Sequence, residues 1–190
     1  MLVVARHGET EANVAGLLLG RADIPLTEEG RRQAAALGAA LAGAAVVVSS
    51  PLARCLETAA CFDAPVEVDD RWVELDYGEY DRQPFSRVPG SLWTRWRVDP
   101  TFRPPGGESL VEVGERVRAA CEDLSTRAVD ADVVVVTHVS PIKAAVAWAL
   151  GVGDEVSWRM FVGLASVTRI AIGDRGPVLT SFNESDHLLR

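Results

Sequence analysis

The sequence predicts an α/β fold, with a doubly wound, mostly parallel sheet, helices on both of its faces and a small inserted lid. Short runs of apolar and β-branched residues alternate along the chain with longer segments of helical character. Such alternation is typical of strand–helix–strand units, whose strands pair in parallel. A stretch at about 75–108 breaks the alternation and is rich in Pro, Gly, Trp and Arg. At 190 residues, the chain fits a single domain, 1–190, with this stretch as its lid.

The first half of the chain contains predicted strands at 2–5, 46–48 and 66–68. Thr27 is the predicted N-cap of a helix, because two glutamates follow it and an alanine-rich stretch runs on to Leu41. Gly43 is a plausible stop for that helix. A second helix is predicted to start with Ser50 as its cap and Pro51 at its first helical position.

The second half of the chain continues the alternation. A short helix is predicted at 92–98, inside the lid. Ser109 and Glu112 have the spacing of a capping box, so a helix is expected from there to about 127. Another helix is predicted to open at Ser140 and Pro141 and to end near Gly151. Predicted strands lie at 133–137, 167–172 and 178–182.

The composition argues against several functions. A formal net charge of −8 is unfavourable for a general nucleic-acid binder. No apolar stretch is long enough to span a membrane, and the N-terminal apolar run is too short for a signal peptide. The three cysteines, Cys55, Cys61 and Cys121, include no CxxC pair, so we expect no disulfide framework and a cytoplasmic location. No zinc-ligand spacing occurs, and neither a metal nor a cofactor is expected.

The chemistry-bearing residues gather at predicted strand ends. Arg6 and His7 directly follow the first strand, and His138 follows the strand at 133–137. In open α/β sheets, ligands bind at the carboxyl ends of the strands. Arg54 lies in the first turn of the helix after 46–48, where a helix N-terminus and a guanidinium form a natural anion site. A phosphate site with a nucleophile or proton carrier is therefore predicted at this edge.

Further motifs extend this pattern over nearly the whole chain, in a set order. They are RHGET at 6–10 with Asn13, Gly20 with Asp23, PLT at 25–27, SPLAR at 50–54, ETA at 57–59, Glu74 before DYGEY at 76–80, GGES at 106–109, and TH at 137–138. Together they resemble the histidine phosphatase superfamily, in its phosphoglycerate-mutase-like group. RHG alone is a weak motif, whereas the complete ordered set is highly specific.

The resemblance implies a mechanism. His7 would attack phosphorus and form a phosphohistidine, while Arg6, Arg54 and His138 would surround the phosphoryl oxygens. Such charge stabilisation and positioning are what phosphoryl transfer needs most. Glu74 would protonate the leaving alkoxide and then take a proton from the attacking water.

The resemblance also implies the substrate-binding residues, which are Arg6, Asn13, Gly20, Arg54, His138 and Val139. Three positions depart from the family pattern. Leu19 stands where Gln, Ser or Thr is usual, which leaves the backbone of Gly20 as the donor there. Val139 replaces a common Gly after the second histidine. Arg82 stands where a Gly often follows the acidic stretch.

Three functions remain open at this point. The favoured one is a metal-independent phosphatase acting on a small phosphorylated metabolite, such as a phosphosugar, a phosphoglycerate-like acid or α-ribazole phosphate. The first alternative is a cofactor-dependent phosphoglycerate mutase, although mutases of this family tend to be longer and the lid lacks a basic run. The second is a non-catalytic module that binds a phosphorylated ligand. Lid arginines could hold a second anionic group of the substrate. Both a monomer and a homodimer are compatible with the sequence.

Overall fold

A computed structural model describes residues 1–189 of the chain. Its strands form one sheet in the order β3-β2-β4-β1-β5-β6. The strands are β1 (Leu2–Arg6), β2 (Val46–Ser49), β3 (Val66–Val68), β4 (Val133–Thr137), β5 (Val167–Gly173) and β6 (Gly176–Glu184). The pairs from β3 through β1 are parallel, whereas β5 and β6 run antiparallel at one edge. The predicted α/β class and mostly parallel sheet are thus confirmed.

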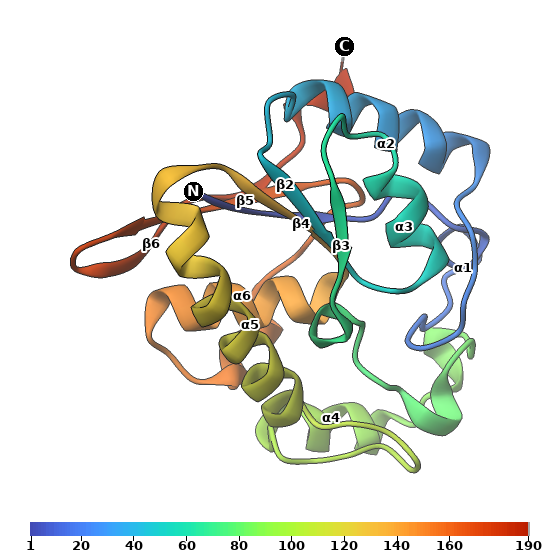
Figure 1. Cartoon of the computed structure of the whole chain (residues 1–190). Helices are drawn as coiled ribbons and strands as arrows, with labels where there is room; N and C mark the ends of the chain where they lie inside the picture. The colour runs from blue at the N-terminus through green and yellow to red at the C-terminus, as the bar shows by residue number, and fades with distance from the viewer. Residues whose placement is uncertain (190) are drawn as a thin grey trace.

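Helices cover both faces of this sheet (Figure 1). The α-helices are α1 (Glu11–Val14), α2 (Glu28–Ala40), α3 (Ala53–Ala59), α4 (Gly90–Val98), α5 (Leu110–Asp130) and α6 (Val139–Leu150). Short 3-10 helices occur at Asp70–Trp72, Gly78–Tyr80, Phe85–Arg87, Asp154–Arg159 and Asp186–Leu189. In Figure 1, α2 and α3 lie on one side of the sheet, and α5 and α6 lie on the other. Within residues 1–189, no helix is both long and apolar enough to cross a membrane.

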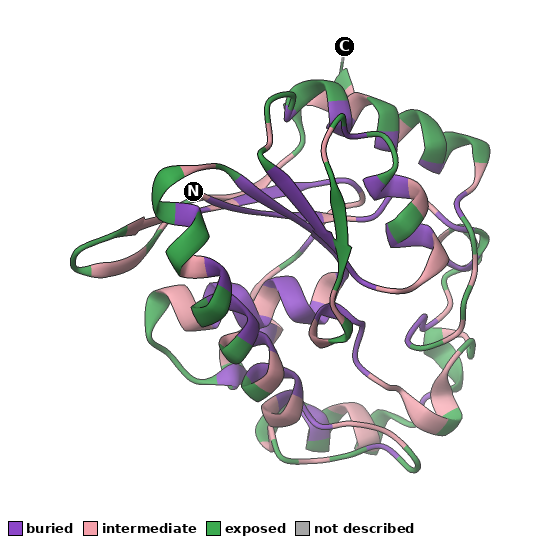
Figure 2. Ribbon diagram, in the orientation of Figure 1, coloured by how far each residue is buried: buried purple, intermediate pink, exposed green. Residues whose placement is uncertain are grey.

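The central strands are buried (Figure 2), and alternation along them divides the core in two. Val3, Val47 and Val134 belong to the cluster that packs toward α2 and α3. Val4 and Val135 point the other way, into the larger cluster with α5 and α6. Because successive strand residues face opposite sides, strands covered on both sides are apolar along nearly all of their length. This is why the valine runs in the sequence predict these strands so well.

The helix starts follow the predicted caps in two cases. The hydroxyl of Thr27 accepts a hydrogen bond from the Gly30 N–H at 2.9 Å, and Ser109 and Glu112 form both halves of a capping box. Gly43 lies beyond the end of α2, in the following turn, with a φ of +96°.

Two predicted starts are wrong by two residues. Helix α3 begins at Ala53 with Leu52 as its N-cap, and the Ser50 hydroxyl accepts from Nε2 of His138 at 2.8 Å and from the Leu52 N–H at 3.5 Å. Helix α6 begins at Val139, so its N-cap is His138 rather than Ser140.

The turn after β1 packs backbone to backbone on α2. A Cβ added at Gly8 would lie 2.3 Å from the Gly30 carbonyl oxygen, and one added at Gly30 would lie 2.1 Å from the Glu9 oxygen. Neither position can therefore carry a side chain without a shift of the backbone. This close approach sets the position of the segment that carries His7.

Residues 75–108, here called the lid segment, contain two of the 3-10 helices and α4, which covers the helix predicted at 92–98. Its aromatic side chains pack together: the rings of Trp93 and Trp96 are stacked 5.7 Å apart, and both meet Trp158 at 6.2 Å, edge to face. Arg82 has a φ of +61°, in the left-handed region that favours glycine. That conformation matches the expectation that a glycine is usual at this position.

Candidate active site

The carboxyl ends of β1 and β4 bring the two histidines together, as predicted. Arg6 pairs with Thr137 in the sheet, and the N–H of His7 donates to the Thr137 carbonyl at 3.0 Å. His7 and His138 follow these residues, and their rings meet edge to face with centroids 5.1 Å apart. Both side chains are buried.

The ring of His7 is held with one nitrogen free. Its Nδ1 lies 2.7 Å from the Gly8 carbonyl oxygen, which can only accept, so Nδ1 carries the proton and donates. Nε2 is then the atom with the lone pair. Burial lowers the pKa of His7 well below its ordinary value, and the nearby charges of Arg6 and Arg54 lower it further. The imidazole is therefore a neutral base with its lone pair on Nε2.

Arg6 faces a cavity beside His7 with part of its guanidinium unpaired. Its Nη1 donates to the Val162 carbonyl at 2.8 Å, but its buried Nε has no partner within residues 1–189. Burial lowers the pKa of Arg6 to about 10, against the favourable charge of Glu74. A buried donor without an acceptor is costly, so an anionic oxygen would be stabilised here.

Arg54 is fully buried and bridges the loop at Gly20 to His138. It donates to the carbonyls of Gly20 and Ala22, each at 2.8 Å, and through Nε to Nδ1 of His138 at 3.2 Å. A guanidinium has five N–H groups, so two remain after these three bonds. Burial lowers the pKa of Arg54 from its ordinary value.

The hydrogen bonds of His138 are those of a neutral imidazole. Its Nδ1 accepts from Arg54, so the proton is on Nε2, which donates to the Ser50 hydroxyl. Burial, followed by the charge of Arg54, lowers the pKa of His138 well below its ordinary value. Both ring nitrogens are therefore engaged within the protein.

The carboxylate of Glu74 lies at the N-terminus of α6. It accepts from the N–H groups of Leu75 at 2.7 Å, Val139 at 3.0 Å and Ser140 at 3.1 Å. Its side chain is buried and lines the same cavity as Arg6 and His7. The free N–H groups of a helix start hold an anionic oxygen well, so the orientation of Glu74 is set by α6.

The remaining predicted residues divide into two groups. Asn13 and Val139 line the cavity. The side-chain oxygen of Asn13, Oδ1, accepts from the backbone N–H and the hydroxyl of Thr10. The side-chain nitrogen of Asn13 is left as a donor. Gly20 does not line the cavity, and its N–H already donates to the Asp81 carboxylate at 2.8 Å.

The cavity has a volume of about 260 Å³ and reaches from Arg6 and His7 to the lid segment. Its apolar wall consists of Leu17, Leu18, Leu19, Leu75, Tyr77, Phe85, Trp93, Trp96, Leu110 and Trp158. Ser157 and Lys143 add polar groups. Lys143 is not among the site residues predicted from the sequence, although its place one helical turn after Val139 puts the two on one face of α6.

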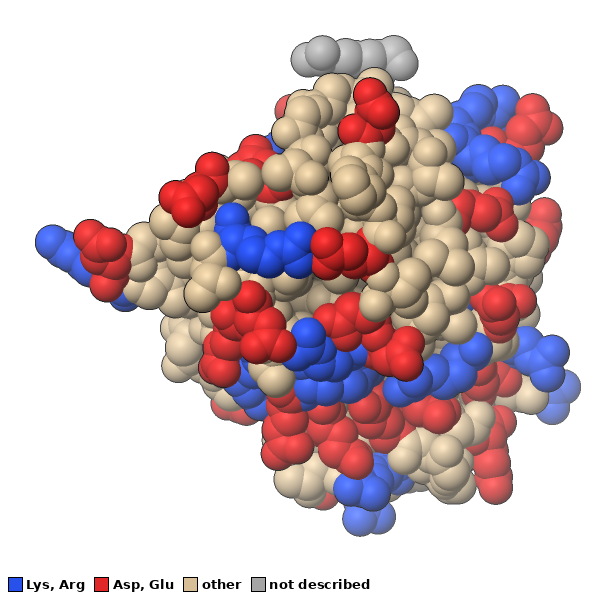
Figure 3. Space-filling view, viewed as in Figure 1, with Lys and Arg blue, Asp and Glu red and all other residues tan. Residues whose placement is uncertain are grey.

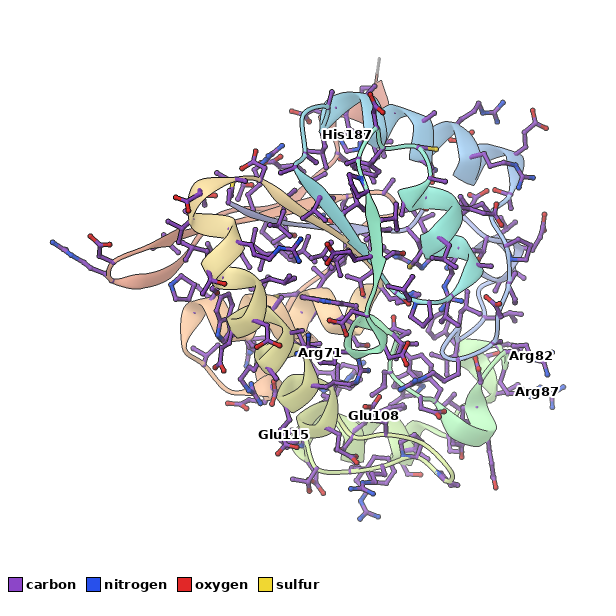
Figure 4. All side chains as sticks on the ribbon, in the orientation of Figure 1. Arg71, Arg82, Arg87, Glu108, Glu115 and His187 are labelled. Carbon is purple, nitrogen blue, oxygen red and sulfur yellow. The ribbon has the colours of Figure 1, made fainter. Side chains whose placement is uncertain are left out.

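The lid arginines do not line this cavity. Arg82, Arg87, Arg95, Arg97 and Arg103 are all exposed. Arg82 and Arg87 lie at the periphery of the molecule (Figure 4). Arg95 lies 4.6 Å from the centre of the Phe102 ring, and Arg103 pairs with Glu112. The described part of the chain also contains no group of three or more His, Cys, Asp or Glu side chains placed to hold a metal ion.

We expect the free energy of unfolding to fall as the pH drops below about 6.5, the ordinary histidine value. The pKa values of His7 and His138 are lower in the folded protein than in the unfolded chain. Below pH 6.5 the unfolded chain therefore binds protons that the native state does not bind. Their contribution is complete above pH 6.5 and is lost toward the folded pKa, by up to about 1.4 kcal/mol per pH unit for each histidine. Urea titrations between pH 5 and 8 would measure this slope. His7→Asn should reduce it, and an unchanged slope would contradict a neutral His7.

Comparison with known proteins identifies the family of this chain. The model of the histidine phosphatase superfamily (branch 1) matches residues 2–185. The chain belongs to this superfamily. The resemblance expected from the sequence is therefore confirmed.

Relatives of this histidine phosphatase chain include both longer and similar-sized proteins. A bifunctional protein of Mycobacterium tuberculosis is 38% identical over 177 residues, which cover 88% of this chain and 49% of that protein. The chain thus spans about half the length of this relative. Phosphoserine phosphatase 1 of Hydrogenobacter thermophilus is 32% identical over 197 residues, covering 98% of this chain and 93% of that protein.

A solved structure of the same fold is also similar. The crystal structure of phosphoserine phosphatase from Entamoeba histolytica, in complex with 3-phosphoglyceric acid, has a TM-score of 0.91 to this chain, at 27% identity. The match covers 98% of each chain. The histidine phosphatase fold therefore extends over nearly all of the molecule.

Proposed function

We propose that this chain hydrolyses small phosphomonoesters through a phosphohistidine on His7, with Glu74 as general acid and base and without a metal ion. The observation that carries the proposal is the pair formed by His7 and Arg6. A neutral imidazole with a free Nε2 lines the same cavity as a guanidinium whose buried Nε has no acceptor in the described part of the chain. A phosphoryl group placed between them would meet a nucleophile and a charge-assisted donor at once.

The first half of the reaction transfers the phosphoryl group to the protein. His7 Nε2 attacks phosphorus, the P–O bond to the leaving group breaks, and Glu74 gives its proton to the departing oxygen. Arg6 stabilises the charge on the phosphoryl oxygens, and the charge of the fully buried Arg54 adds to this from outside the cavity lining. His138 acts in this scheme mainly through its bond to Arg54, which holds that guanidinium in place.

The second half returns the protein to its starting state. A water molecule gives a proton to the Glu74 carboxylate and attacks phosphorus, and the P–N bond to His7 breaks. Inorganic phosphate leaves, and Glu74 is protonated again for the next ester. The chain's own cations supply the charge at each step, which is why we expect no metal requirement.

The alternatives from the sequence are less well supported. A mutase that uses a bisphosphate needs cations for a second phosphate, but the lid arginines are exposed and do not line the cavity. A binding module has no need of a nucleophile next to a buried carboxylate, and both His7 and Glu74 line the cavity.

The relatives and the cavity favour a small metabolite as substrate. One similar protein is named a phosphoserine phosphatase, and a structural neighbour binds 3-phosphoglyceric acid. A cavity of about 260 Å³ is at the lower end of ligand pockets and suits a compound of that size.

We also propose a cytoplasmic location, with which the free Cys55, Cys61 and Cys121 agree. The mixed acidic and basic face in Figure 3 offers no basic patch for nucleic acid.

The proposal is tested by phosphate release from p-nitrophenyl phosphate in the presence of EDTA. We expect turnover that EDTA does not reduce, because His7, Arg6 and Arg54 provide the nucleophile and the charge. Added 2,3-bisphosphoglycerate should not be required. Well-folded protein that releases no phosphate, or activity that returns only with a divalent metal, would contradict it.

A further inference from the structure

One cavity residue is not used by the proposed reaction. Lys143 is the only lysine in the sequence, and it lies on α6, five residues after His138. It lines the cavity together with Arg6, His7 and Glu74. The site therefore contains a cation beyond those needed around the phosphoryl group.

Lys143 is half-buried, and within residues 1–189 its ammonium group makes neither a salt bridge nor a side-chain hydrogen bond. The carboxylate of Glu74 lines the same cavity, but it already accepts from the backbone of Leu75, Val139 and Ser140. Burial lowers the pKa of Lys143, and Arg6 lowers it further, while Glu74 raises it. A cation kept in such a place without a partner is best stabilised by an anion that arrives with the ligand.

The surroundings of Lys143 limit what that ligand can be. The wall between the phosphoryl site and the lid segment is formed by Leu17, Leu18, Phe85, Trp93 and Trp158, among other apolar residues. Such a wall favours an apolar body on the substrate. A second phosphate would call for arginine forks, whereas a single ammonium matches one carboxylate.

We infer that Lys143 binds a carboxylate of the substrate, and that the substrate is a small phosphomonoester in which an apolar body joins that carboxylate to the phosphorylated oxygen. This inference rests on the proposed function, because it takes Arg6 and His7 as the phosphoryl site. Lys143, and not the lid arginines, would then bind the second anionic group of the substrate.

A binding experiment tests this without turnover. The probes are (3-carboxybenzyl)phosphonate and its neutral counterpart, (3-carbamoylbenzyl)phosphonate, titrated calorimetrically into the wild type, Lys143→Met and Arg87→Met. We expect the wild type and the Arg87→Met control to bind the carboxylate probe about tenfold or more tightly than the carbamoyl probe. One tenfold step is about 1.4 kcal/mol, within the range of a partly desolvated charge pair. In Lys143→Met the preference should disappear while the affinity for the carbamoyl probe stays within about threefold.

The other outcomes are informative in turn. Equal loss of affinity for both probes in Lys143→Met would make Lys143 a support for Glu74 and overturn the inference. An unchanged preference, or no binding of either probe to the wild type, would overturn it too. A preference that depends on Lys143 in a protein that hydrolyses no ester would uphold the inference and contradict the proposed function alone.

Discussion

His7→Ala is expected to abolish phosphate release without unfolding the protein. The variant lacks the nitrogen that we propose attacks phosphorus, and the neighbouring His138 cannot replace it because both of its ring nitrogens are engaged. Loss of a covalent nucleophile commonly costs on the order of 10⁴-fold or more in kcat. Steady-state hydrolysis of p-nitrophenyl phosphate with EDTA present would measure the effect. The melting temperature should stay close to that of the wild type, because residue 7 lines the cavity and the buried strand before it is unchanged.

A second readout of the same variant follows the intermediate itself. Brief reaction with a ³²P-labelled phosphomonoester, followed by quenching in base, should leave an acid-labile label on the wild type and none on His7→Ala. Near-normal turnover in the variant would remove His7 from the role of nucleophile. Label on the variant would do the same even if its turnover were slow.

Glu74→Gln is expected to slow esters with poor leaving groups by about 10²–10⁴-fold, and p-nitrophenyl phosphate far less. An alkoxide needs a proton as it leaves, and glutamine cannot give one, whereas p-nitrophenolate leaves well without help. The comparison of kcat/KM for an alkyl phosphate and p-nitrophenyl phosphate measures this split. Equal slowing of both esters would count against Glu74 as the acid.

The structure adds a necessary control to that experiment. The two oxygens of Glu74 accept from Leu75, Val139 and Ser140, and the glutamine amide would set an N–H group against one of these donors. A lost acceptor of this kind costs about 1–3 kcal/mol of stability. The melting temperature of Glu74→Gln should therefore fall, and the assay should be run well below it. Loosening of α6 would lower kcat/KM for both esters by the same factor. The ratio of the two kcat/KM values therefore separates this effect from a loss of acid catalysis.

The sequence predicts the fold well where packing alone decides it. Strands β1, β2 and β4 are buried on both faces, so each is apolar up to its last residue, and such runs are visible in a single sequence. The convergence of His7 and His138 also follows, since parallel strands end at one edge. The arrangement of β5 and β6 as an antiparallel hairpin was not specified by their apolar patterns, which do not encode direction.

The hydrogen bonds that the sequence did not predict join polar groups that lie far apart in the chain. Ser50 has the residue type of an N-cap, but its hydroxyl pairs with His138, which is 88 residues away in the chain. The N–H of Gly20 pairs with Asp81 across a similar gap. The burial of His138 beside Arg54, which lowers the pKa of this histidine, also depends on residues far apart in the chain. Such long-range competition has no signature in local spacing, so the detailed hydrogen bonding of the site could not be predicted.

The aromatic packing of the lid segment has a practical consequence. Trp93, Trp96 and Trp158 touch one another and also line the cavity, so a ligand that enters changes the polarity around their indoles. The nearly parallel rings of Trp93 and Trp96, 20° apart, are also close enough to couple in circular dichroism. The molecule thus carries a built-in optical reporter. Intrinsic fluorescence would follow occupancy of the cavity in real time, with neither a dye nor a chromogenic ester.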